Sequence, residues 1–292
     1  MINTIYVNGQ FISSDKACLS PLDRGFLYGD GIFETIRVYD RVPFRWNQHI
    51  ERMTDSARAL EINWKEETQK LKDIVSELLK RNNLKNAYLR ISVSRGIHTG
   101  DLGFDSDHNP TTVIVTDKLK APSYAEYERG VPATVVQHPW ASPMAAHKTL
   151  SYLPYLAARH KARKAGMSEA LLCDPSGRLT EGTTSNIFLV LRNKVFTPPA
   201  DGTILGGITR RVALESLKSL NIECEENRVT VEDAARADEI FITNSIIEVL
   251  PVTALDKTPV GDGKVGPITK SAMDAYRSEV QKEIETAKKI SD

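Results

Sequence analysis

Cysteine is scarce in this chain of 292 residues, and the three that occur lie far apart. Cys18, Cys173 and Cys224 have no CxxC pair or His-rich neighbours, so neither a disulfide framework nor a zinc site is expected. No segment offers the roughly 20 consecutive apolar residues that cross a bilayer. The opening residues MINTIYVNGQFIS lack the basic and apolar parts of a secretory signal. A soluble, cytoplasmic protein without membrane partners is expected.

An excess of charge of either sign is missing as well. Lysine plus arginine and aspartate plus glutamate both number 38, so the formal net charge is zero. No overall field therefore attracts nucleic acid or anionic lipid, and no nucleic-acid partner is expected. The length suits two domains of modest size, each able to bury a core.

The first 118 residues predict a small α/β domain. An Asn8-Gly9 turn separates two apolar runs, which is typical of a hairpin. The run IFETIRVYD alternates as a half-buried strand does, with Ile32, Glu34, Ile36 and Val38 on one side. Apolar spacing then predicts two helices, over about residues 50–60 and 71–79, and the runs AYLRISVS and TTVIVTD predict further strands.

The rest of the chain predicts a larger C-terminal domain. Residues 119–130, polar and proline-bearing, are interpreted as an interdomain linker, and residues 131–292 as the second domain. Its expected strands are VPATVVQ, SEALLCD, SNIFLV and EIFITN, and its expected helices cover residues 151–164, 209–220 and 269–288. The predicted fold class is α+β or α/β with two domains.

Lys148 stands in AHKTLSYLPY, a largely apolar setting for an amine. Desolvation disfavours the ammonium form, so a partly buried lysine here has a lowered pKa and can attack a carbonyl carbon. The alternative is a lysine that lays its stem on apolar surface and keeps its charge in water. The residue alone favours this second interpretation.

Glu181, in LTEGTTSNIFLV, precedes a run that predicts a buried strand. If Lys148 forms a Schiff base with pyridoxal phosphate, a carboxylate is needed to keep the pyridine nitrogen protonated. The small residues 182–185 then leave room for a flat ring. The alternative is an exposed acid in a DPSGRLTEG turn.

The segment ILGGITRR, residues 204–211, places two glycines before an expected helix. The free N–H groups and positive dipole at a helix start suit a phosphate. The pattern is common in loops, and it matches neither GxxxxGK[ST] nor GxGxxG. It therefore supports a phosphate site only together with Lys148 and Glu181.

Over nearly its whole length the chain resembles the fold-type IV pyridoxal-phosphate enzymes. This family includes branched-chain aminotransferases, D-amino-acid aminotransferases and 4-amino-4-deoxychorismate lyases. The matching segments, in order, are DRGFLYGDGIFETIRVYD, HIERM, the lysine segment, LTEGTTSNIF, GGITR and TNSIIEVLPV. The resemblance implies the two-domain D-amino-acid-aminotransferase-like fold and pyridoxal 5′-phosphate as cofactor.

The resemblance also implies roles for individual residues. Lys148 would bind the cofactor covalently and move the proton in catalysis, and Glu181 would pair with the pyridinium. Arg52 would bind the phosphate through its planar fork, or be an exposed helix arginine. The remaining implied cofactor contacts are Leu205, Ile208, Thr209, Ser245 and Ile246. Tyr152 lies four positions after Lys148 where branched-chain enzymes place a tyrosine at five, so a cofactor contact and core packing both remain open.

Substrate choice is expected to depend on the first domain. Tyr88 and Arg90 match a Tyr-x-Arg pair near the substrate carboxylate of branched-chain enzymes, and Phe33 matches a pocket aromatic; alternatively, Tyr88 and Arg90 face solvent. The Arg-x-His pair of D-amino-acid aminotransferases is replaced by Gly100 and Leu102. The asparagine-arginine pair of the lyase is missing from KTLSYL.

The expected function is transamination from an amino acid, with a branched-chain L-amino acid as the first choice, to 2-oxoglutarate by a ping-pong mechanism. Alternatives are a D-amino-acid or (R)-amine transaminase, the lyase, and a non-catalytic binding module on the same fold. The resemblance implies a homodimer. A metal site at Asp101, Asp105, Asp107 and His108 is not expected, because GDLGFDSDHN does not fit an EF-hand loop.

Overall fold

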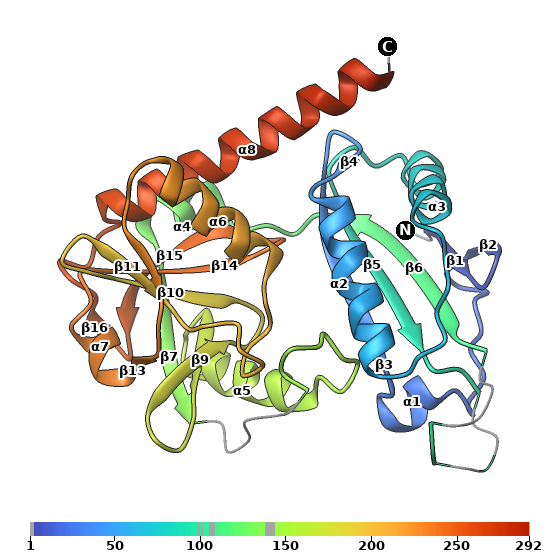
Figure 1. Ribbon diagram of the computed structural model, residues 1–292, viewed down its shortest axis with the longest axis horizontal. Coiled ribbons are helices and arrows are strands. Elements are labelled where there is room, and N and C mark those ends of the chain that lie inside the picture. The colour runs from blue at the N-terminus through green and yellow to red at the C-terminus, as the bar shows by residue number, and fades with distance from the viewer. Residues whose placement is uncertain (1–2, 98–99, 101, 105–108, 138–143, 292) are drawn as a thin grey trace. The chain divides into compact units, whose positions relative to one another are not determined.

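The computed structural model describes residues 3–97, 100, 102–104, 109–137 and 144–291. The chain divides into two compact units (Figure 1). Unit 1 comprises Met1–Lys120, His147–Tyr152 and Glu283–Asp292, and unit 2 comprises Ala121–Ala146 and Leu153–Lys282. The residues considered as metal ligands, Asp101, Asp105, Asp107 and His108, lie outside the described residues.

Unit 1 is built on an antiparallel sheet of six strands among the described residues, in the order β2-β1-β6-β5-β3-β4. The strands are β1 (Thr4–Val7), β2 (Gln10–Ser13), β3 (Gly31–Tyr39), β4 (Val42–Pro43), β5 (Ala87–Ser94) and β6 (Thr111–Lys118). The helices are α1 (Arg24–Tyr28), α2 (Trp46–Ala59) and α3 (Thr68–Arg81). The expected hairpin is confirmed, because Asn8 and Gly9 take φ angles of 43° and 94°, as a type I′ turn requires.

Alternation gives the sheet of unit 1 two different faces. One face, with Ile36, Leu89 and Ile91, is fully buried in one hydrophobic cluster with the apolar sides of α2 and α3. Figure 1 shows α2 lying across this sheet. On the other face, Phe33 is opposite Ser92 and Thr35 is opposite Arg90 in the β3–β5 register. Most side chains on this second face are only half-buried, which leaves it available for a site.

Unit 2 contains the larger sheet, of ten strands within the described part of the chain, in the order β12-β11-β10-β14-β15-β7-β8-β9-β13, with β16 paired to β15. The strands are β7 (Val131–Gln137), β8 (Glu169–Cys173), β9 (Arg178–Gly182), β10 (Asn186–Leu191), β11 (Lys194–Thr197), β12 (Cys224–Glu226), β13 (Val229–Thr230), β14 (Glu239–Asn244), β15 (Glu248–Leu255) and β16 (Thr258–Pro259). The helices are α4 (Tyr124–Arg129), α5 (Leu153–Lys164), α6 (Ile208–Ser219), α7 (Val231–Ala235) and α8 (Pro267–Ser291), of which the residues from Glu283 onward are counted with unit 1. β8, β10 and β14 are almost wholly buried, which explains their continuous apolar sequences.

The units begin and end elsewhere than at the expected domain ranges 1–118 and 131–292. Residues 147–152 are counted with unit 1 because Thr149 pairs with Ile32 of β3 in an isolated bridge. The expected linker 119–130 contains α4, which belongs to unit 2 and begins with a capping box between Ser123 and Glu126. The S-x-x-E spacing of SYAE was the sequence signal for this helix.

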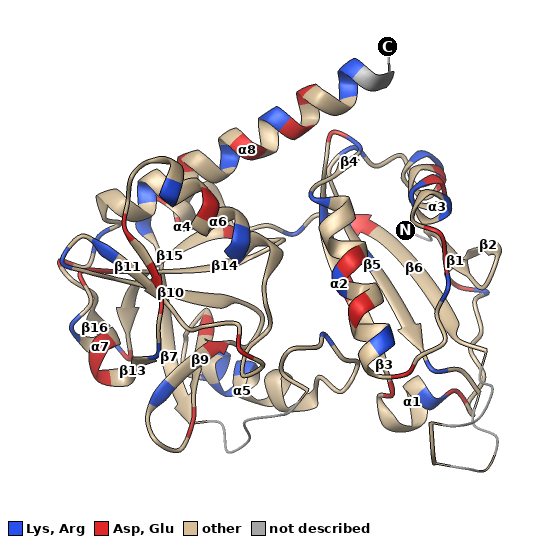
Figure 2. Ribbon diagram, viewed as in Figure 1, with Lys and Arg blue, Asp and Glu red and all other residues tan. Residues whose placement is uncertain are grey.

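Charges of both signs alternate along α3 and α8 (Figure 2), in keeping with the zero net charge. Within the part of the chain that the structure describes, no helix combines the length and apolarity that crossing a membrane requires. The same residues contain no group of three or more His, Cys, Asp or Glu side chains able to hold a metal ion.

Candidate active site

The segment that carries Lys148 is tied to the beginning of β3 by backbone hydrogen bonds. Phe33 N–H donates to the carbonyl of Lys148 at 2.8 Å, and Leu150 N–H donates to that of Gly31 at 2.9 Å. A Cβ atom at Gly31 would lie 2.4 Å from the carbonyl oxygen of Val93, so only glycine fits between these strands. The backbone at Lys148 is therefore fixed relative to the half-buried face of the sheet.

Four of the predicted site residues meet on this face. The Lys148 amine lies 4.6 Å from the centre of the Phe33 ring and 5.9 Å from that of Tyr152, and these rings pack edge to face at 5.6 Å. The Arg90 guanidinium lies 3.6 Å from the same Phe33 ring centre, while its Nε donates to Ser92 Oγ at 3.0 Å. A half-buried amine and a guanidinium thus share one aromatic neighbour. Tyr88 lies on the same face, opposite Arg37.

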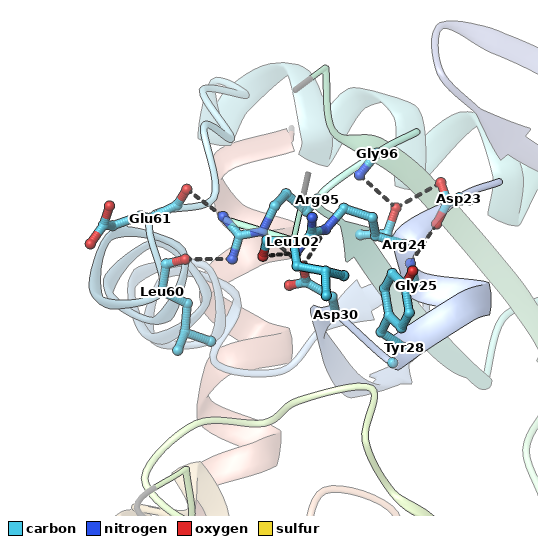
Figure 3. A network of polar contacts seen from close by, with 12 residues as sticks. Asp23, Arg24, Gly25, Tyr28, Asp30, Leu60, Glu61, Arg95, Gly96 and Leu102 are labelled. Carbon is cyan, nitrogen blue, oxygen red and sulfur yellow. Dashed lines mark hydrogen bonds and ion pairs between the residues drawn. The ribbon is translucent and has the colours of Figure 1, made fainter. Parts of the chain in front are cut away.

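A network of polar contacts fixes the chain that leads into β3 (Figure 3). Asp30 accepts hydrogen bonds from Nε of Arg24 at 2.8 Å and from Nε of Arg95 at 2.9 Å. Arg95 also donates to the carbonyls of Glu61 and Leu60 just beyond α2, at 2.7 and 2.8 Å. Burial alone would raise the pKa of Asp30, but the two arginines hold this pKa below its ordinary value.

Arg52, the predicted phosphate ligand, is oriented by a buried carboxylate. Its Nε and Nη2 donate to Oε1 and Oε2 of Glu34 at 2.7 and 2.8 Å, a bidentate pair that uses two of the five guanidinium N–H groups. Nδ1 of the buried His49 lies 2.7 Å from Glu34 Oε2. Burial would raise the pKa of Glu34, but the charge of Arg52 and the His49 contact hold it well below its ordinary range. Burial lowers the pKa of His49, against the opposing pull of Glu34.

This triad predicts loss of stability in acid. The folded-state pKa values of His49 and Glu34 are both lowered, so below each ordinary value the unfolded chain binds more protons than the folded chain. Stability should fall as the pH drops below about 6.5, the ordinary value for histidine, and fall further below about 4.3, that for glutamate. The slope for one proton is at most about 1.4 kcal/mol per pH unit. Thermal unfolding of the parent protein and of His49→Gln between pH 8 and pH 5 measures this pH dependence of stability. If stability falls equally with pH in both proteins, His49 is not the group responsible.

In unit 2, Glu181 is a buried carboxylate at the end of β9, not an exposed turn acid. Its Oε2 accepts the backbone N–H of Leu205 at 3.1 Å, and its Oε1 accepts the hydroxyl of Tyr155 at 3.1 Å. Each of the two carboxylate oxygens therefore accepts one hydrogen bond. A buried acceptor held by two donors is suited to bind a protonated ring nitrogen.

The loop that ends at Gly207, before α6, leaves the first backbone N–H groups of the helix without a side-chain cap. The carbonyl of Leu205 accepts Asn186 Nδ2 at 2.8 Å, and α6 begins after Gly207, which supplies no side-chain cap for the first N–H groups. Ile208 and Thr209 are therefore the first helical residues and are buried. Arg210 fixes this end of the helix by donating to the carbonyl of Pro198 at 2.7 Å. Such a helix start suits an anion.

Two glycines in this loop provide a matched pair of variants. A Cβ at Gly207 would lie 2.0 Å from Asn186 Oδ1, whereas one at Gly206 would find only the Ala200 Cβ, at 3.7 Å. Gly207→Ala should therefore destabilise the protein by about 1–3 kcal/mol, because Asn186 or the helix start must move. Gly206→Ala should be within about 1 kcal/mol of the parent. Thermal unfolding measures both; equal melting temperatures would contradict the tight fit at Gly207.

The predicted Ser245-Ile246 contact lies in a turn held by Asn244. Oδ1 of Asn244 accepts the backbone N–H groups of Ile246 and Ile247 at 2.8 and 2.9 Å, and its Nδ2 donates to the carbonyl of Thr184 at 2.9 Å. Asn244 thus joins this turn to the residues that follow Glu181. The predicted phosphate ligands of unit 2 and its predicted acid belong to one connected part of the structure.

Sequence reasoning missed several residues of these sites. Glu34 alternates with Ile32, Ile36 and Val38, so the strand pattern already placed a carboxylate on the buried face, where it requires partners. His49 and Arg52, three positions apart on α2, are those partners. Tyr155, Asn186 and Asn244 had no comparable signal, because their roles depend on contacts between distant segments.

Comparisons with known proteins place the chain in one family. The family model Amino-transferase class IV matches residues 31–255. A protein of Methanocaldococcus jannaschii, assigned as a branched-chain-amino-acid aminotransferase, is 38% identical over 275 residues, covering 94% of this chain and 95% of that protein. A D-alanine aminotransferase of Staphylococcus haemolyticus is 32% identical (95% of this chain, 98% of that protein). An aminodeoxychorismate lyase of Bacillus subtilis is also 32% identical (95% and 94%).

Solved structures give the same result for the fold. The Escherichia coli branched-chain amino acid aminotransferase superposes with a TM-score of 0.88 at 28% identity, covering 95% of this chain and 94% of that one. The Thermoproteus uzoniensis branched-chain aminotransferase with norvaline has a TM-score of 0.85 at 28% identity, covering 95% and 94%. The predicted two-domain fold type is confirmed.

The residues present fit the cofactor of such enzymes. Taken by itself, unit 1 contains a half-buried amine beside aromatic rings. Taken by itself, unit 2 contains a buried carboxylate and an uncapped helix start where a Cβ at Gly207 would collide. These are groups for an aldehyde, a ring nitrogen and a phosphate. The chain belongs to the class IV aminotransferases, whose members depend on pyridoxal 5′-phosphate.

Proposed function

We propose that this protein transfers the amino group of a branched-chain L-amino acid to 2-oxoglutarate. The observation that carries the proposal is the arrangement of Lys148 and Arg90 about the Phe33 ring, at 4.6 and 3.6 Å from its centre. A reactive amine and a carboxylate-binding guanidinium on one sheet face can hold an α-amino acid between them. The likeness to branched-chain aminotransferases in sequence and structure supports the choice of substrate.

When bound, the cofactor supplies an aldehyde for the amine of the substrate and a ring that withdraws electrons from its Cα. Lys148 Nζ would hold the cofactor covalently between turnovers and, once the substrate amine has replaced it, would accept the proton from the substrate Cα and return it on the cofactor side. Glu181 keeps the proton on the ring nitrogen. Leu205 and Tyr155 hold the carboxylate of Glu181 in place for that purpose, with hydrogen bonds of 3.1 Å each.

The phosphate has three proposed partners. Arg52 provides a guanidinium whose plane is set by Glu34. The N–H groups of Ile208 and Thr209 provide the start of α6. Ser245 and Ile246 provide the turn that Asn244 organises. A guanidinium and a helix start each favour a dianionic group.

Phe33, Tyr88 and Arg90 are the proposed substrate residues. Arg90 would bind a substrate carboxylate, and its position is limited by the Ser92 hydroxyl and the Phe33 ring. Phe33, which is only 5% exposed and lies against the Arg90 guanidinium, would add apolar surface to the substrate site and so favour an aliphatic side chain. Tyr152 packs against Phe33 and would limit the same pocket.

The amino donor decides between members of the family. Purified protein incubated with L-leucine and 2-oxoglutarate should yield glutamate and 4-methyl-2-oxopentanoate. D-alanine, an (R)-amine and aminodeoxychorismate are tested in parallel. Faster turnover of D-alanine or the (R)-amine would replace the proposed specificity, and release of pyruvate from aminodeoxychorismate would identify a lyase. A protein that binds no cofactor and converts none of these would be a binding module.

We also propose that two copies of the chain associate. Large apolar side chains around α1 are exposed: Leu22 (54%), Phe26 (75%), Leu27 (40%) and Tyr28 (48%). Apolar surface of this kind is commonly covered by another protein surface. Light scattering after size-exclusion chromatography should give twice the chain mass, and Phe26→Glu should shift the protein towards the mass of one chain. A single-chain mass for the parent protein would contradict the proposal.

A further inference from the structure

Glu169 in β8 lies at the centre of an unusual cluster of donors in unit 2. Its side chain is only 3% exposed. Oε1 accepts from Arg159 Nη1 at 3.2 Å, from the backbone N–H of Ala170 at 3.0 Å and from the hydroxyl of Thr183. Oε2 accepts from the hydroxyls of Thr184 and Ser185 at 3.1 and 3.2 Å.

The hydroxyls of three consecutive residues, Thr183, Thr184 and Ser185, donate to one buried carboxylate, although backbone hydrogen bonds already close this turn. Gly182 N–H donates to the carbonyl of Ser185 at 2.6 Å, which already closes the turn, and Thr183 N–H donates to the carbonyl of Ala170 at 3.1 Å. A Cβ at Gly182 would lie 2.2 Å from Ser185 Oγ, so glycine is required for that hydroxyl to reach Glu169. Burying a carboxylate is costly unless such partners satisfy it.

The turn that Glu169 holds begins directly after Glu181. β8 and β9 pair through Leu171 and Gly182, and a register shift follows between Leu171 and Cys173. Glu181 therefore stands at an irregular strand end, where the ladder alone does not fix the direction of its side chain. Glu169 holds the backbone immediately beyond it, and Thr184 extends the contact to Asn244 through its carbonyl, at 2.9 Å.

We infer that Glu169 is a positioning residue for the cofactor: through Thr183, Thr184 and Ser185 it fixes both the Glu181 carboxylate and the turn at Ser245. The inference rests on the proposed function, because it assigns Glu181 to the ring nitrogen and Ser245 to the phosphate. In this role Glu169 would contact neither the ring nitrogen nor the phosphate of the cofactor. The Glu169 carboxylate holds the turn after Glu181 and, through Thr184 and Asn244, the turn at Ser245. Binding of the ring nitrogen and binding of the phosphate in unit 2 would therefore depend on the same residue.

Glu169→Gln tests the inference. The amide has the same shape as the carboxylate, but its NH₂ group is a donor and would face hydroxyls that donate to Glu169 in the parent protein. We expect kcat to fall about ten- to a hundredfold, as for a misplaced catalytic group. We also expect the apoprotein to bind pyridoxal 5′-phosphate at least about tenfold more weakly, and the absorbance of the bound cofactor to move towards that of Glu181→Gln. The double variant with Glu181→Gln should be within about twofold of Glu181→Gln alone.

Glu239→Gln is the matched control. Glu239 is also a buried glutamate of unit 2, and it accepts the N–H groups of Ile268 and Thr269 at the start of α8, at 3.0 and 2.7 Å. This variant should lose stability but keep kcat and cofactor affinity within about twofold. If Glu169→Gln also loses only stability, Glu169 is only structural and the inference is wrong. The same holds if the fold-losses in kcat of Glu169→Gln and Glu181→Gln multiply in the double variant.

A smaller change covers the case in which Glu169→Gln does not fold. Thr184→Ala removes one of the three hydroxyls and should shift cofactor affinity and absorbance in the same direction, whereas Thr184→Ser should restore both. No shift in Thr184→Ala would also overturn the inference. Failure of the proposed function looks different, because the parent protein would then bind no cofactor, or Glu181→Gln would match the parent.

Discussion

Lys148→Ala should abolish transamination. We expect a loss of about 10³-fold or more in kcat, because the variant loses both the covalent anchor of the cofactor and the group that moves the proton. The absorbance band of lysine-bound cofactor should disappear with it. The backbone contacts of residue 148 with Phe33 do not involve the side chain, so the fold should survive, with a melting temperature within about 3 °C of the parent.

Lys161→Ala is the control for this variant. Lys161 is an exposed lysine on α5, a short distance along the chain. Its removal should leave kcat and the absorbance band within about twofold of the parent. A folded Lys148→Ala protein that keeps more than about a tenth of the parent activity would remove Lys148 from the mechanism.

Glu181→Gln should be the next most damaging change. The amide can still accept the Leu205 N–H and meet the Tyr155 hydroxyl, so its position is kept, but it carries no negative charge to hold a proton on the ring nitrogen. We expect kcat to fall by about 10²- to 10³-fold, the usual loss for one preorganised electrostatic contact. Steady-state rates with the best donor measure this.

The matched control is Glu215→Gln, at an exposed position on α6. Its kcat should equal that of the parent within about twofold. If Glu181→Gln retains more than about a third of the parent kcat, the carboxylate is not needed at the ring nitrogen. The buried position of Glu181 would then have to be explained by its bonds to Leu205 and Tyr155 alone.

The strongly periodic elements could be predicted from the sequence. The Asn8-Gly9 hairpin, the alternating β3 and the apolar stripes of α2 and α3 lie where local pattern places them. The helix expected over residues 269–288 is α8, at Pro267–Ser291. These elements follow the pattern because each buries one face or stripe against a single core.

The irregular elements could not be predicted in the same way. β9 carries Glu181 in RLTEG, a run with one large apolar residue, and it exists because β8 and β13 pair with it on either side. The Lys148 segment has no strand pattern and is fixed by two backbone bonds to β3. Pairing of this kind depends on residues far away in the chain, which a local pattern does not contain.

In the candidate site, too, some features follow from local sequence and others depend on distant residues. Residue type and order predicted an amine, an acid and a helix start, and the resemblance assigned them to one cofactor. The partners that orient these groups, such as Glu34 for Arg52 and Asn186 for Leu205, come from other segments. Glu34 alone had a local signal, a charge on an apolar face, because a buried carboxylate demands a cation or several donors.

The central claim is that Lys148 and Glu181 hold opposite ends of one pyridoxal ring. The most direct test is a crystal structure of the holoenzyme after borohydride treatment, which fixes the cofactor to the amine that carries it. We expect a bond from Lys148 Nζ to the former aldehyde carbon, with a Glu181 oxygen about 2.6–3.2 Å from the ring nitrogen. A cofactor attached to another lysine, or a ring nitrogen out of reach of Glu181, would contradict it.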